Sequence, residues 1–342
     1  MAKSTVILKR TNIMKFIDNQ NINHPALNLA LEEYAFRHFD SENTYFLFYI
    51  NEPSIIIGKH QNTYEEINSN YVVQNKIHVV RRITGGGAVY HDLGNLNFSF
   101  MDKAVGHVFN RYETFTKPIV EALRTLGVPA ELNGRNDIVV NDKKISGNAQ
   151  YQHGGRMLCH GTLLFNTNLD HVTQALNVKQ DKIQSKGIKS IRSRVANISE
   201  FLKTPMSIEE FKQYLLKFIF GSHIPQQEIT HKEWKKIEQF AEEKYKNWDW
   251  NYGHSPEFNI QNRKRFPFGE IDVRLFVKDG LIQSIKFYGD FFAQKEISEL
   301  ENQLIHVSYE AQKIHHALSQ IHLPHYLGEM KAEELTDLLC GI

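Results

Sequence analysis

The stretch RRITGGGAVYHD, from Arg81 to Asp92, sets two adjacent arginines before three consecutive glycines and ends on a His-Asp pair. The run HVVRRI (78–83) predicts a strand that delivers the chain to the glycines. Because glycine lacks a Cβ, its N–H groups can meet a ligand face-on and its φ angle can be positive. A phosphate or carboxylate suits such a loop, since neighbouring guanidinium groups form bidentate contacts with either anion.

The glycine stretch matches neither of the two common nucleotide-loop fingerprints. The chain contains no GxxxxGK[ST], and a GxGxxG that begins at Gly85 would need glycine at Tyr90. An ordinary glycine-rich turn beside two solvated arginines is the competing explanation. Strand alternation places Arg81 and Arg82 on opposite faces, so we expect one of them to face a ligand.

Composition bounds the class of protein. The chain has 342 residues, enough for two domains or for one domain with an appendage. Its hydrophobic content of 41% and charged content of 23% are ordinary for a globular protein, and its net charge of +1 gives no bulk attraction for nucleic acid. The first residues lack a signal-peptide pattern and no apolar run could span a membrane, so we expect a cytoplasmic protein that binds neither nucleic acid nor membrane.

Metal and thiol chemistry find little support in the sequence. Cys159 and Cys340 are its two cysteines, and none of the 17 histidines belongs to an HExxH motif. Cys159 and His160 are neighbours in a predicted strand, so their side chains should point to opposite faces. We expect Cys159 to be a buried structural residue, whereas His160 either faces the site or is a hydrogen-bonded core residue.

The first half of the chain predicts short strands mixed with helices. Aromatic and β-branched runs predict strands at 44–50, 54–59, 78–83, 95–101 and 156–166. Helices are predicted at 25–39, at 111–126 with Pro118 kinking the helix or marking its start, and after the capping box of Ser207 and Glu210.

After about residue 220 the composition changes. A charged helix (231–248) precedes an aromatic junction (248–258) that looks loosely tied to either side. A hairpin with Asp279-Gly280 at its turn follows, and helical patterns over 293–305, 308–320 and 331–340 finish the chain. We therefore expect two domains, over residues 1–248 and 249–342.

The segment DIVVNDKKISGNAQ (137–150) predicts a β-hairpin. Strict alternation would put Lys144, Ser146 and Asn148 on one polar face and Gly147 on the other. Glycine within a strand indicates close approach of a ligand or of another backbone segment. A solvated hairpin is the competing explanation.

A basic stretch, KIQSKGIKSIRSR (182–194), follows the hairpin and the strand after it. It lacks the interleaved aromatic residues that single-stranded nucleic acids stack on. It predicts either a solvated face or a loop that meets an acidic partner or covers a negatively charged intermediate.

Five motifs, taken together and in order, resemble the lipoate–protein ligase A family of the lipoate/biotin protein ligase superfamily: RRITGGGAVYHDLGNLNFSF, GRNDIVV, KKISGNAQ, CHGTLLFN and KGIKSIRSRVANI. WDWNYGHSPEF and the hairpin after it resemble that family's C-terminal accessory domain. The resemblance covers nearly the whole chain. It implies an α/β (α+β) fold: a mixed-sheet catalytic domain related to class II synthetase cores, over 1–248, and a small α+β accessory domain, over 249–342.

The resemblance also implies an activity, with a place in lipoate salvage. ATP and lipoate would form lipoyl-AMP and pyrophosphate, and the lipoyl group would pass to a lysine of an acceptor protein. The implied acceptors are the E2 lipoyl domains of 2-oxoacid dehydrogenases and the glycine-cleavage H protein. ATP chemistry implies Mg²⁺ on the phosphates, but no DxD-like cluster assigns its ligands. Lipoate and octanoate both stay open as the preferred acyl donor.

By motif match, the resemblance carries over roles for individual residues. Lys144 would contact both lipoate and the adenylate phosphate and be catalytic, and Gly85 and Gly86 would line the lipoyl tunnel. His160 is a further candidate for lipoate binding, while His91 and Asp92 receive no role beyond bracing the loop. The implied positions for ATP or the adenylate are Arg82, Gly87, Ala88, Val89, Tyr90, Asp137 and Lys144.

Three alternatives fit the sequence less well. Octanoyltransferases of the same superfamily use a cysteine just ahead of the lysine hairpin, whereas VPAELNGRNDIVV (128–140) contains none. Biotin ligases have a different arginine-glycine pattern, which RRITGGG fits poorly. A lipoate-binding sensor without turnover would not need Arg82, Lys144 and the glycines together.

Overall fold

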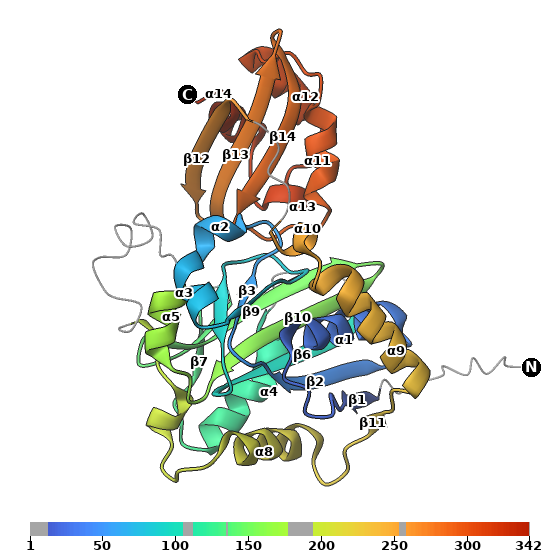
Figure 1. Ribbon diagram of the computed structural model, residues 1–342, viewed down its shortest axis with the longest axis vertical. Coiled ribbons are helices and arrows are strands. Elements are labelled where there is room, and N and C mark those ends of the chain that lie inside the picture. The colour runs from blue at the N-terminus through green and yellow to red at the C-terminus, as the bar shows by residue number, and fades with distance from the viewer. Residues whose placement is uncertain (1–12, 105–111, 135, 177–193, 253–257, 342) are drawn as a thin grey trace, which may run out of the picture.

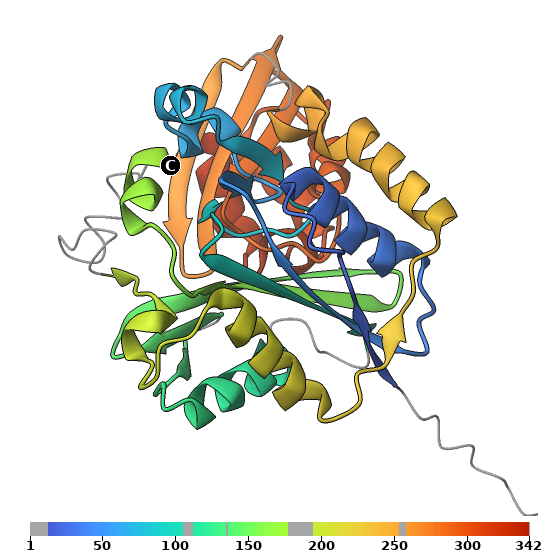
Figure 2. The same cartoon turned by 60° about the horizontal axis from the view of Figure 1, so that its bottom comes forward.

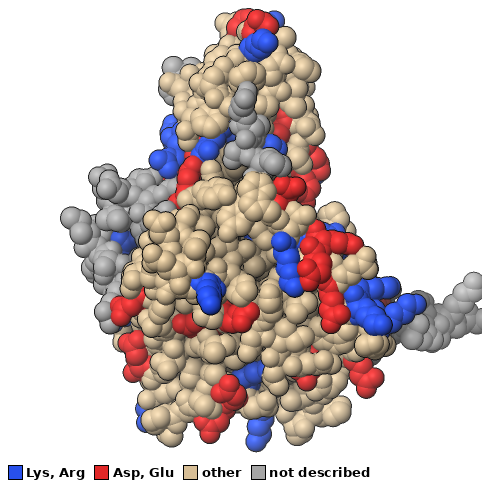
Figure 3. Space-filling view, in the orientation of Figure 1, with Lys and Arg blue, Asp and Glu red and all other residues tan. Residues whose placement is uncertain are grey.

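The computed structural model describes residues 13–104, 112–134, 136–176, 194–252 and 258–341. Its larger part is built around one long sheet, and a smaller part with its own sheet stands on top (Figure 1). Figure 3 shows acidic and basic side chains in small groups on a face whose remaining described surface is largely uncharged. Among the described residues, no helix combines the length and apolar character that a bilayer crossing needs.

The central sheet has eight strands. Their order is β11 (Gln226–Gln227), β1 (Met14–Ile17), β2 (Thr44–Ile50), β6 (Asn95–Lys103), β10 (Arg156–Leu164), β9 (Lys143–His153), β8 (Asp137–Val140) and β7 (Glu131–Asn133). The first three strands run parallel to one another, and the remaining neighbours are antiparallel. The sheet is therefore mixed, as predicted.

Both faces of this sheet are covered, so its strands carry apolar residues on both sides. In β2, Phe46 and Phe48 face one core, while Tyr45, Leu47 and Tyr49 face the other. The first face packs against α4 (Tyr112–Thr125) and α8 (Ile208–Phe220); the second packs against α1 (Pro25–His38) and α9 (His231–Phe240). Figure 2 shows the two helix pairs on opposite sides of the sheet.

Local signals bound α4 and α8 where the sequence predicts, whereas α9 differs from its prediction. Ser207 and Glu210 form the capping box that begins α8. Gly127, with φ +83°, follows α4 and supplies the left-handed conformation of its last turn. The helix continues through Pro118, which lies in its interior. The charged helix is divided: α9 continues as the π-helix η2 (Ala241–Tyr245) and is followed by α10 (Trp248–Asn251).

A second, three-stranded sheet holds the glycine stretch. Its order is β4 (His78–Arg81), β3 (Ser54–Ile57) and β5 (Val89–His91), and residues 82–88 connect β4 to β5. Strand β5 has three residues, too few to show a pattern in the sequence. The short helices α2 (Thr63–Glu66), α3 (Ser69–Gln74), α5 (Leu169–Ala175) and η1 (Ile198–Phe201) complete the larger part.

The smaller part is an antiparallel sheet of β12 (Ile260–Phe266), β13 (Gly269–Lys278) and β14 (Leu281–Gly289). Helices α11 (Ile297–Leu304), α12 (Ala311–Ser319), α13 (Pro324–Leu327) and α14 (Ala332–Cys340) share its apolar core. Asp279 and Gly280 have φ angles of +53° and +74°, so the predicted hairpin turn is confirmed. Strand β12 escaped prediction because its largely polar sequence, IQNRKRF, lacks an apolar alternation.

The alternation predicted for the lysine hairpin is wrong, because β9 contains a bulge. Ile138 is paired with Ser146, but the next residue, Val139, is paired with Lys144, so Ile145 is an extra residue in β9. Lys144 therefore shares a face with Gly147 rather than with Ser146. A Cβ on Gly147 would come within 2.8 Å of the Lys144 Nζ, so a side chain here would displace the lysine amine from its present position.

The junction after η2 is not loosely tied over its described residues. The Trp250 side chain donates from Nε1 to the Arg81 carbonyl at 2.8 Å, and the Asn251 side chain accepts from the Arg81 N–H at 2.9 Å. The Arg81 guanidinium in turn donates to the carbonyls of Gly58, Gln61 and Trp250. Arg81 is thus a buried bracket between β4 and the junction, and burial lowers its pKa to about 10.

We predict that Arg81→Met lowers the free energy of unfolding by about 3–5 kcal/mol, because it leaves several buried carbonyl oxygens without a hydrogen-bond donor. Urea unfolding measures the change. Lys235→Met is the control, since Lys235 is an exposed residue of α9 and its loss should change the free energy of unfolding by no more than about 0.5 kcal/mol. A loss below about 1 kcal/mol for Arg81→Met would contradict the bracket.

Candidate functional site

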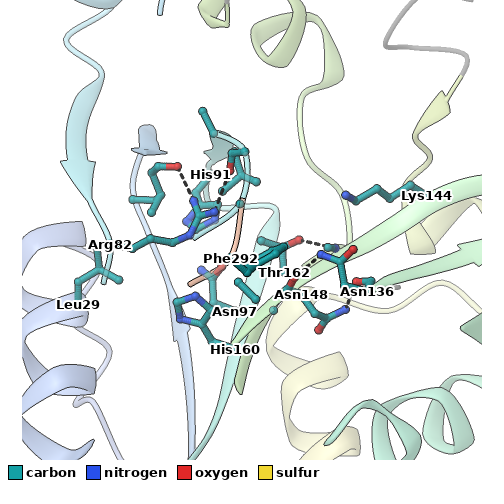
Figure 4. Close-up of a pocket in the computed structure, with 18 of the residues that line it drawn as sticks. Leu29, Arg82, His91, Asn97, Asn136, Lys144, Asn148, His160, Thr162 and Phe292 are labelled. Atoms are coloured by element: carbon teal, nitrogen blue, oxygen red, sulfur yellow. Dashed lines mark hydrogen bonds between the residues drawn. The ribbon is translucent and has the colours of Figure 1, made fainter. Parts of the chain in front are cut away.

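A cavity opens between the long sheet, the small sheet and the C-terminal part (Figure 4). It contains about 630 Å³ of empty space, including the portion open to solvent. Its lining comes from six or more separate segments: Leu29, Tyr49, Ile56, Arg82, Gly86, Gly87, Ala88, Val89, His91, Asn97, Asn136, Lys144, Gly147, Asn148, Ala149, His160, Gly161, Thr162 and Phe292.

The Arg82 side chain holds the glycine loop in its conformation. Its guanidinium donates to the carbonyls of Ile56 at 2.9 Å, Gly85 at 2.7 Å and Gly87 at 2.8 Å, and its Nε donates to the Thr84 hydroxyl at 2.9 Å. Burial lowers the pKa of Arg82 to about 10, so the group stays charged at neutral pH. A fixed positive charge and two captured carbonyls therefore define the conformation of the loop.

Each glycine of the loop meets a different constraint. A Cβ on Gly85 would lie 2.3 Å from the Phe291 carbonyl oxygen, so Gly85 allows the C-terminal part to approach. Gly86 has a φ angle of +90°, a backbone conformation that would be strained for any residue other than glycine. A Cβ on Gly87 would meet nothing within 4 Å, so this residue borders open space where a ligand can come close.

Lys144 lies at the mouth of the cavity. Its Nζ is 2.8 Å from the Asp137 carboxylate, and the two side chains are 38% and 36% exposed. The Lys144 carbonyl accepts a hydrogen bond from the Ala196 N–H at 3.0 Å, which fixes the backbone of the strand at this residue. Such a half-exposed ion pair contributes little stability, about 0–1 kcal/mol, so an anionic ligand can draw the amine away.

His160 joins Arg82 to a buried carboxylate. Its Nδ1 is 2.9 Å from a Glu32 oxygen, and its Nε2 is 2.8 Å from the Thr84 hydroxyl. The Thr84 oxygen accepts a hydrogen bond from Arg82, so the Thr84 O–H can donate to the His160 Nε2. The His160 Nδ1–H then donates to the Glu32 carboxylate. Glu32 is 1% exposed, so this directed chain offsets part of the cost of burying both charges.

The structure brings seven of the predicted site residues to the cavity: Arg82, Gly86, Gly87, Ala88, Val89, Lys144 and His160. Three others lie differently. Gly85 contacts Phe291, Asp137 reaches the site through its ion pair with Lys144, and Tyr90 points away into the core behind β5. As predicted, Arg82 borders the cavity and Arg81 does not.

Several lining residues were not predicted from the sequence. Leu29, Tyr49, Ile56, Asn97 and Thr162 lie in apolar or ordinary helix and strand patterns, which carry no sign of a ligand. Phe292 comes from the C-terminal part, more than 100 residues from the nearest other lining residue in the sequence. Only the packing of the two parts reveals it: the Phe291 carbonyl accepts from the Gly86 N–H at 3.4 Å, and the Phe291 ring stacks on His60.

The thiol nearest the site is not poised for chemistry. Cys159 is fully buried in the core on the opposite face of β10 from His160, as predicted. Burial raises the pKa of its thiol to about 12, which leaves almost no thiolate at neutral pH.

One group of side chains in the described part of the chain has metal-ligand spacing. His24, Glu52 and His78 offer ligand atoms within 4.8 Å of one another, outside the cavity. However, the His24 Nδ1 accepts a hydrogen bond from the Ala26 N–H and caps α1, so that nitrogen is already engaged.

The basic stretch at 182–194 lies almost wholly outside the described residues.

Two family models match the chain. The model described as the lipoyl protein ligase A/B catalytic domain matches residues 24–220, and the model described as the bacterial lipoate protein ligase C-terminus matches residues 255–339. Lipoate-protein ligase LplJ of Bacillus subtilis is 56% identical over 330 residues, covering 95% of this chain and 100% of that protein. Lipoate–protein ligase 1 of Staphylococcus aureus is 50% identical over 327 residues, covering 95% and 100%.

Solved structures give the same match at the level of the fold. P. falciparum LipL1 in complex with lipoate has a TM-score of 0.77 at 25% identity and covers 97% of this chain and 99% of that chain. A lipoate-protein ligase A bound with ATP has a TM-score of 0.59 at 32% identity, covering 71% and 98%. A bi-partite lipoate protein ligase from Thermoplasma acidophilum, analysed with its E2 lipoyl domain, has a TM-score of 0.62 at 31% identity, covering 73% and 98%.

We predict that iodoacetamide at pH 8 alkylates Cys340 at least about tenfold faster than Cys159 in the native protein. The thiolate is the reactive form of cysteine, and a raised thiol pKa lowers the fraction of thiolate at pH 8. Cys340 is half-buried on the last helix, whereas Cys159 is enclosed. Peptide mapping after timed quenching measures both rates, and 8 M urea should equalise them. Comparable native rates would show that Cys159 is accessible.

Proposed function

This chain belongs to the lipoate–protein ligase family, and we propose that it activates lipoate with ATP and transfers the lipoyl group to a lysine of an acceptor protein. One observation carries the proposal: a half-exposed lysine amine at the mouth of the cavity stands across from a glycine loop whose shape a buried arginine defines. In this proposal residues 1–248 form the catalytic domain and 249–342 the accessory domain.

In the first step a carboxylate oxygen of lipoate attacks the α-phosphorus of ATP. The bond from that phosphorus to its bridging oxygen breaks, and pyrophosphate leaves with the oxygen. Two anions must approach each other, so a cation between them lowers the barrier. Lys144 supplies that charge as a point donor, once it exchanges Asp137 for the ligand.

The glycine loop acts as the cradle in both steps. Arg82 captures the Gly85 and Gly87 carbonyls, which leaves the loop preformed before a ligand arrives. Backbone at Gly87 and the residues after it borders open space, so the adenylate can approach it there. We assign Arg82, Gly87, Ala88 and Val89 to the nucleotide side, with Arg82 acting through the loop it holds.

The remaining assignments follow the same geometry. Gly85 and Gly86 support the acyl side of the loop, and His160 contributes to the buried acyl end. Asp137 acts as the resting partner of Lys144, near the adenylate. Tyr90 acts from behind β5, through the strand that presents Val89.

In the second step the unprotonated amine of an acceptor lysine attacks the acyl carbon. Negative charge builds on the acyl oxygen, the C–O bond to the phosphate breaks, and AMP leaves as the amine loses its proton. Lys144 and the loop N–H groups are the donors placed to stabilise that oxygen. Removing one such donor typically costs about a hundred- to a thousand-fold in rate.

Mg²⁺ would enter on the ATP phosphates. Among the described residues that line the cavity there is no Asp or Glu, and Asp137 is the carboxylate at its edge. This donor set suits a magnesium ion held mainly by phosphate oxygens and water, with at most one or two protein carboxylates. The ion would neutralise the departing pyrophosphate, while Lys144 holds the carboxylate and the α-phosphate.

We propose E2 lipoyl domains or a glycine-cleavage H protein as acceptors. The Thermoplasma relative analysed with its E2 lipoyl domain supports this class of partner.

We also propose a cytoplasmic location, which the two free cysteines fit. Octanoyl transfer through a thiol is the second candidate, and the enclosed, weakly acidic Cys159 argues against it. A sensor without turnover would show binding but no pyrophosphate exchange.

The proposal predicts lipoate-dependent ATP–pyrophosphate exchange without any acceptor present. Lys144→Ala should lower the exchange rate by about a hundred- to a thousand-fold, because the two anions then meet without a cation between them. Lys143→Ala is the matched control: Lys143 is the exposed neighbour at the start of β9, and its loss should leave exchange unchanged.

Intact-mass spectrometry of a lipoyl domain incubated with protein, ATP, Mg²⁺ and lipoate tests the full reaction. The proposal predicts one lipoyl adduct per domain, absent when ATP is omitted. Binding of lipoate with neither exchange nor adduct would favour the sensor, and ATP-independent transfer would favour the thiol mechanism. Normal exchange by Lys144→Ala would remove that residue from the chemistry.

A further inference from the structure

His91, at the end of the opening motif, has an unsatisfied nitrogen inside the site. The side chain is 3% exposed and lines the cavity. Its Nδ1 lies 3.0 Å from the Asn51 Nδ2, whereas in the described part of the chain its Nε2 is buried without a hydrogen-bond partner. A buried polar group left in this way is costly and calls for an explanation.

A chain of three asparagines sets which His91 nitrogen carries the proton. Asn19 and Asn28 both donate from Nδ2 to the Ile22 carbonyl at 2.8 Å, and a carbonyl can only accept. The Asn28 Nδ2 also donates to the Asn51 Oδ1 at 2.9 Å. Asn51 must therefore present its Nδ2 to His91 as a donor, so the His91 Nδ1 is an acceptor and its proton lies on Nε2.

The same surroundings keep His91 neutral. Burial, with a smaller contribution from the charge of Arg82, lowers its pKa to about 3. Asn51 can only donate to Nδ1 in this orientation, which also disfavours a second proton there. His91 is thus a rigid, uncharged N–H donor rather than a general acid or base at neutral pH.

The buried His91 donor lies across the cavity from Lys144. Lys144 is 38% exposed at the mouth, and Figure 4 shows it on one side of the cavity, with Arg82 and His91 on the other. The cavity is also lined by Leu29, Tyr49 and Ile56, which belong to the apolar core. When Lys144 holds the carboxylate of an acyl chain, as the proposed function has it, the chain extends from the mouth toward these residues and His91.

We propose that the His91 Nε2–H donates a hydrogen bond to a ring sulfur of lipoate and thereby selects a disulfide-bearing acyl donor over a plain fatty acid of the same length. The inference rests on the proposed function. Beyond its carboxylate, lipoate has only its two sulfurs as hydrogen-bond acceptors. An octanoyl chain has none, so it leaves the buried N–H unsatisfied.

A bound water is the competing occupant. Ser54 is paired with His91 across β3 and β5, and its buried hydroxyl oxygen also has no hydrogen-bond partner among the residues that the structure describes. A water shared by the two groups would satisfy both and would be indifferent to the acyl donor. The two explanations therefore differ in whether lipoate and octanoate are distinguished.

The test compares lipoate with octanoate in ATP–pyrophosphate exchange. His91→Leu should lower the ratio of kcat/KM values, lipoate over octanoate, by roughly two- to tenfold, the range for a modest bond to a weak acceptor. His91→Gln retains an N–H near the Nε2 position and should keep more of the wild-type ratio. His153→Leu, at the exposed end of β9, should not change it.

A ratio unchanged in His91→Leu, or an equal loss with both acids, would overturn the proposal and leave the ligase activity standing. Absence of exchange with either acid in the wild type would instead contradict the proposed function.

Nitrogen-15 NMR of histidine-labelled wild-type protein decides the matter without turnover or a variant. The proposal predicts a His91 protonated at Nε2 and a change in that N–H resonance with lipoate that octanoate does not cause. Protonation at Nδ1, or identical changes with both acids, would overturn it.

Discussion

The buried Arg82 guanidinium is the interaction on which the rest of the site depends. It holds two carbonyls of the glycine loop and one of β3, and through Thr84 and His160 it reaches the Glu32 carboxylate. A charge this deeply buried is tolerated because its donors meet acceptors in a fixed arrangement. The loop that cradles the adenylate and the acyl end of the cavity are therefore parts of one hydrogen-bonded unit.

The two arginines of the opening motif divide the work between chemistry and architecture. Arg82 faces the cavity, while Arg81 faces the junction and ties β4 to Trp250 and Asn251. The C-terminal part contacts the glycine loop through Phe291 and Phe292. Ion pairs from Lys59 to Glu296 and from Arg274 to Glu65 also join the two parts of the chain. One dipeptide thus links the site to the packing of both parts of the chain.

Strong periodic signals made most of the fold predictable from the sequence. Strand β2, helix α1 and the Asp279-Gly280 turn lie where the pattern predicts, because burial on both faces, helical spacing and turn chemistry are local properties. The bulge at Ile145 was missed, since an extra strand residue shows itself only through its partner's register. Phe292 was missed because it enters the site by long-range packing, and the donor role of His91 depends on a chain of amides from three segments.

The most direct test of the account is lipoate-dependent pyrophosphate exchange by Arg82→Lys. Lysine keeps the positive charge but offers a single ammonium in place of the planar fork, so it cannot hold the Ile56, Gly85 and Gly87 carbonyls together. The account predicts a chain that still unfolds cooperatively in urea but loses exchange by about a hundred-fold or more. Exchange at the wild-type rate would contradict it, because charge alone, and not the shape that Arg82 imposes on the loop, would then be sufficient.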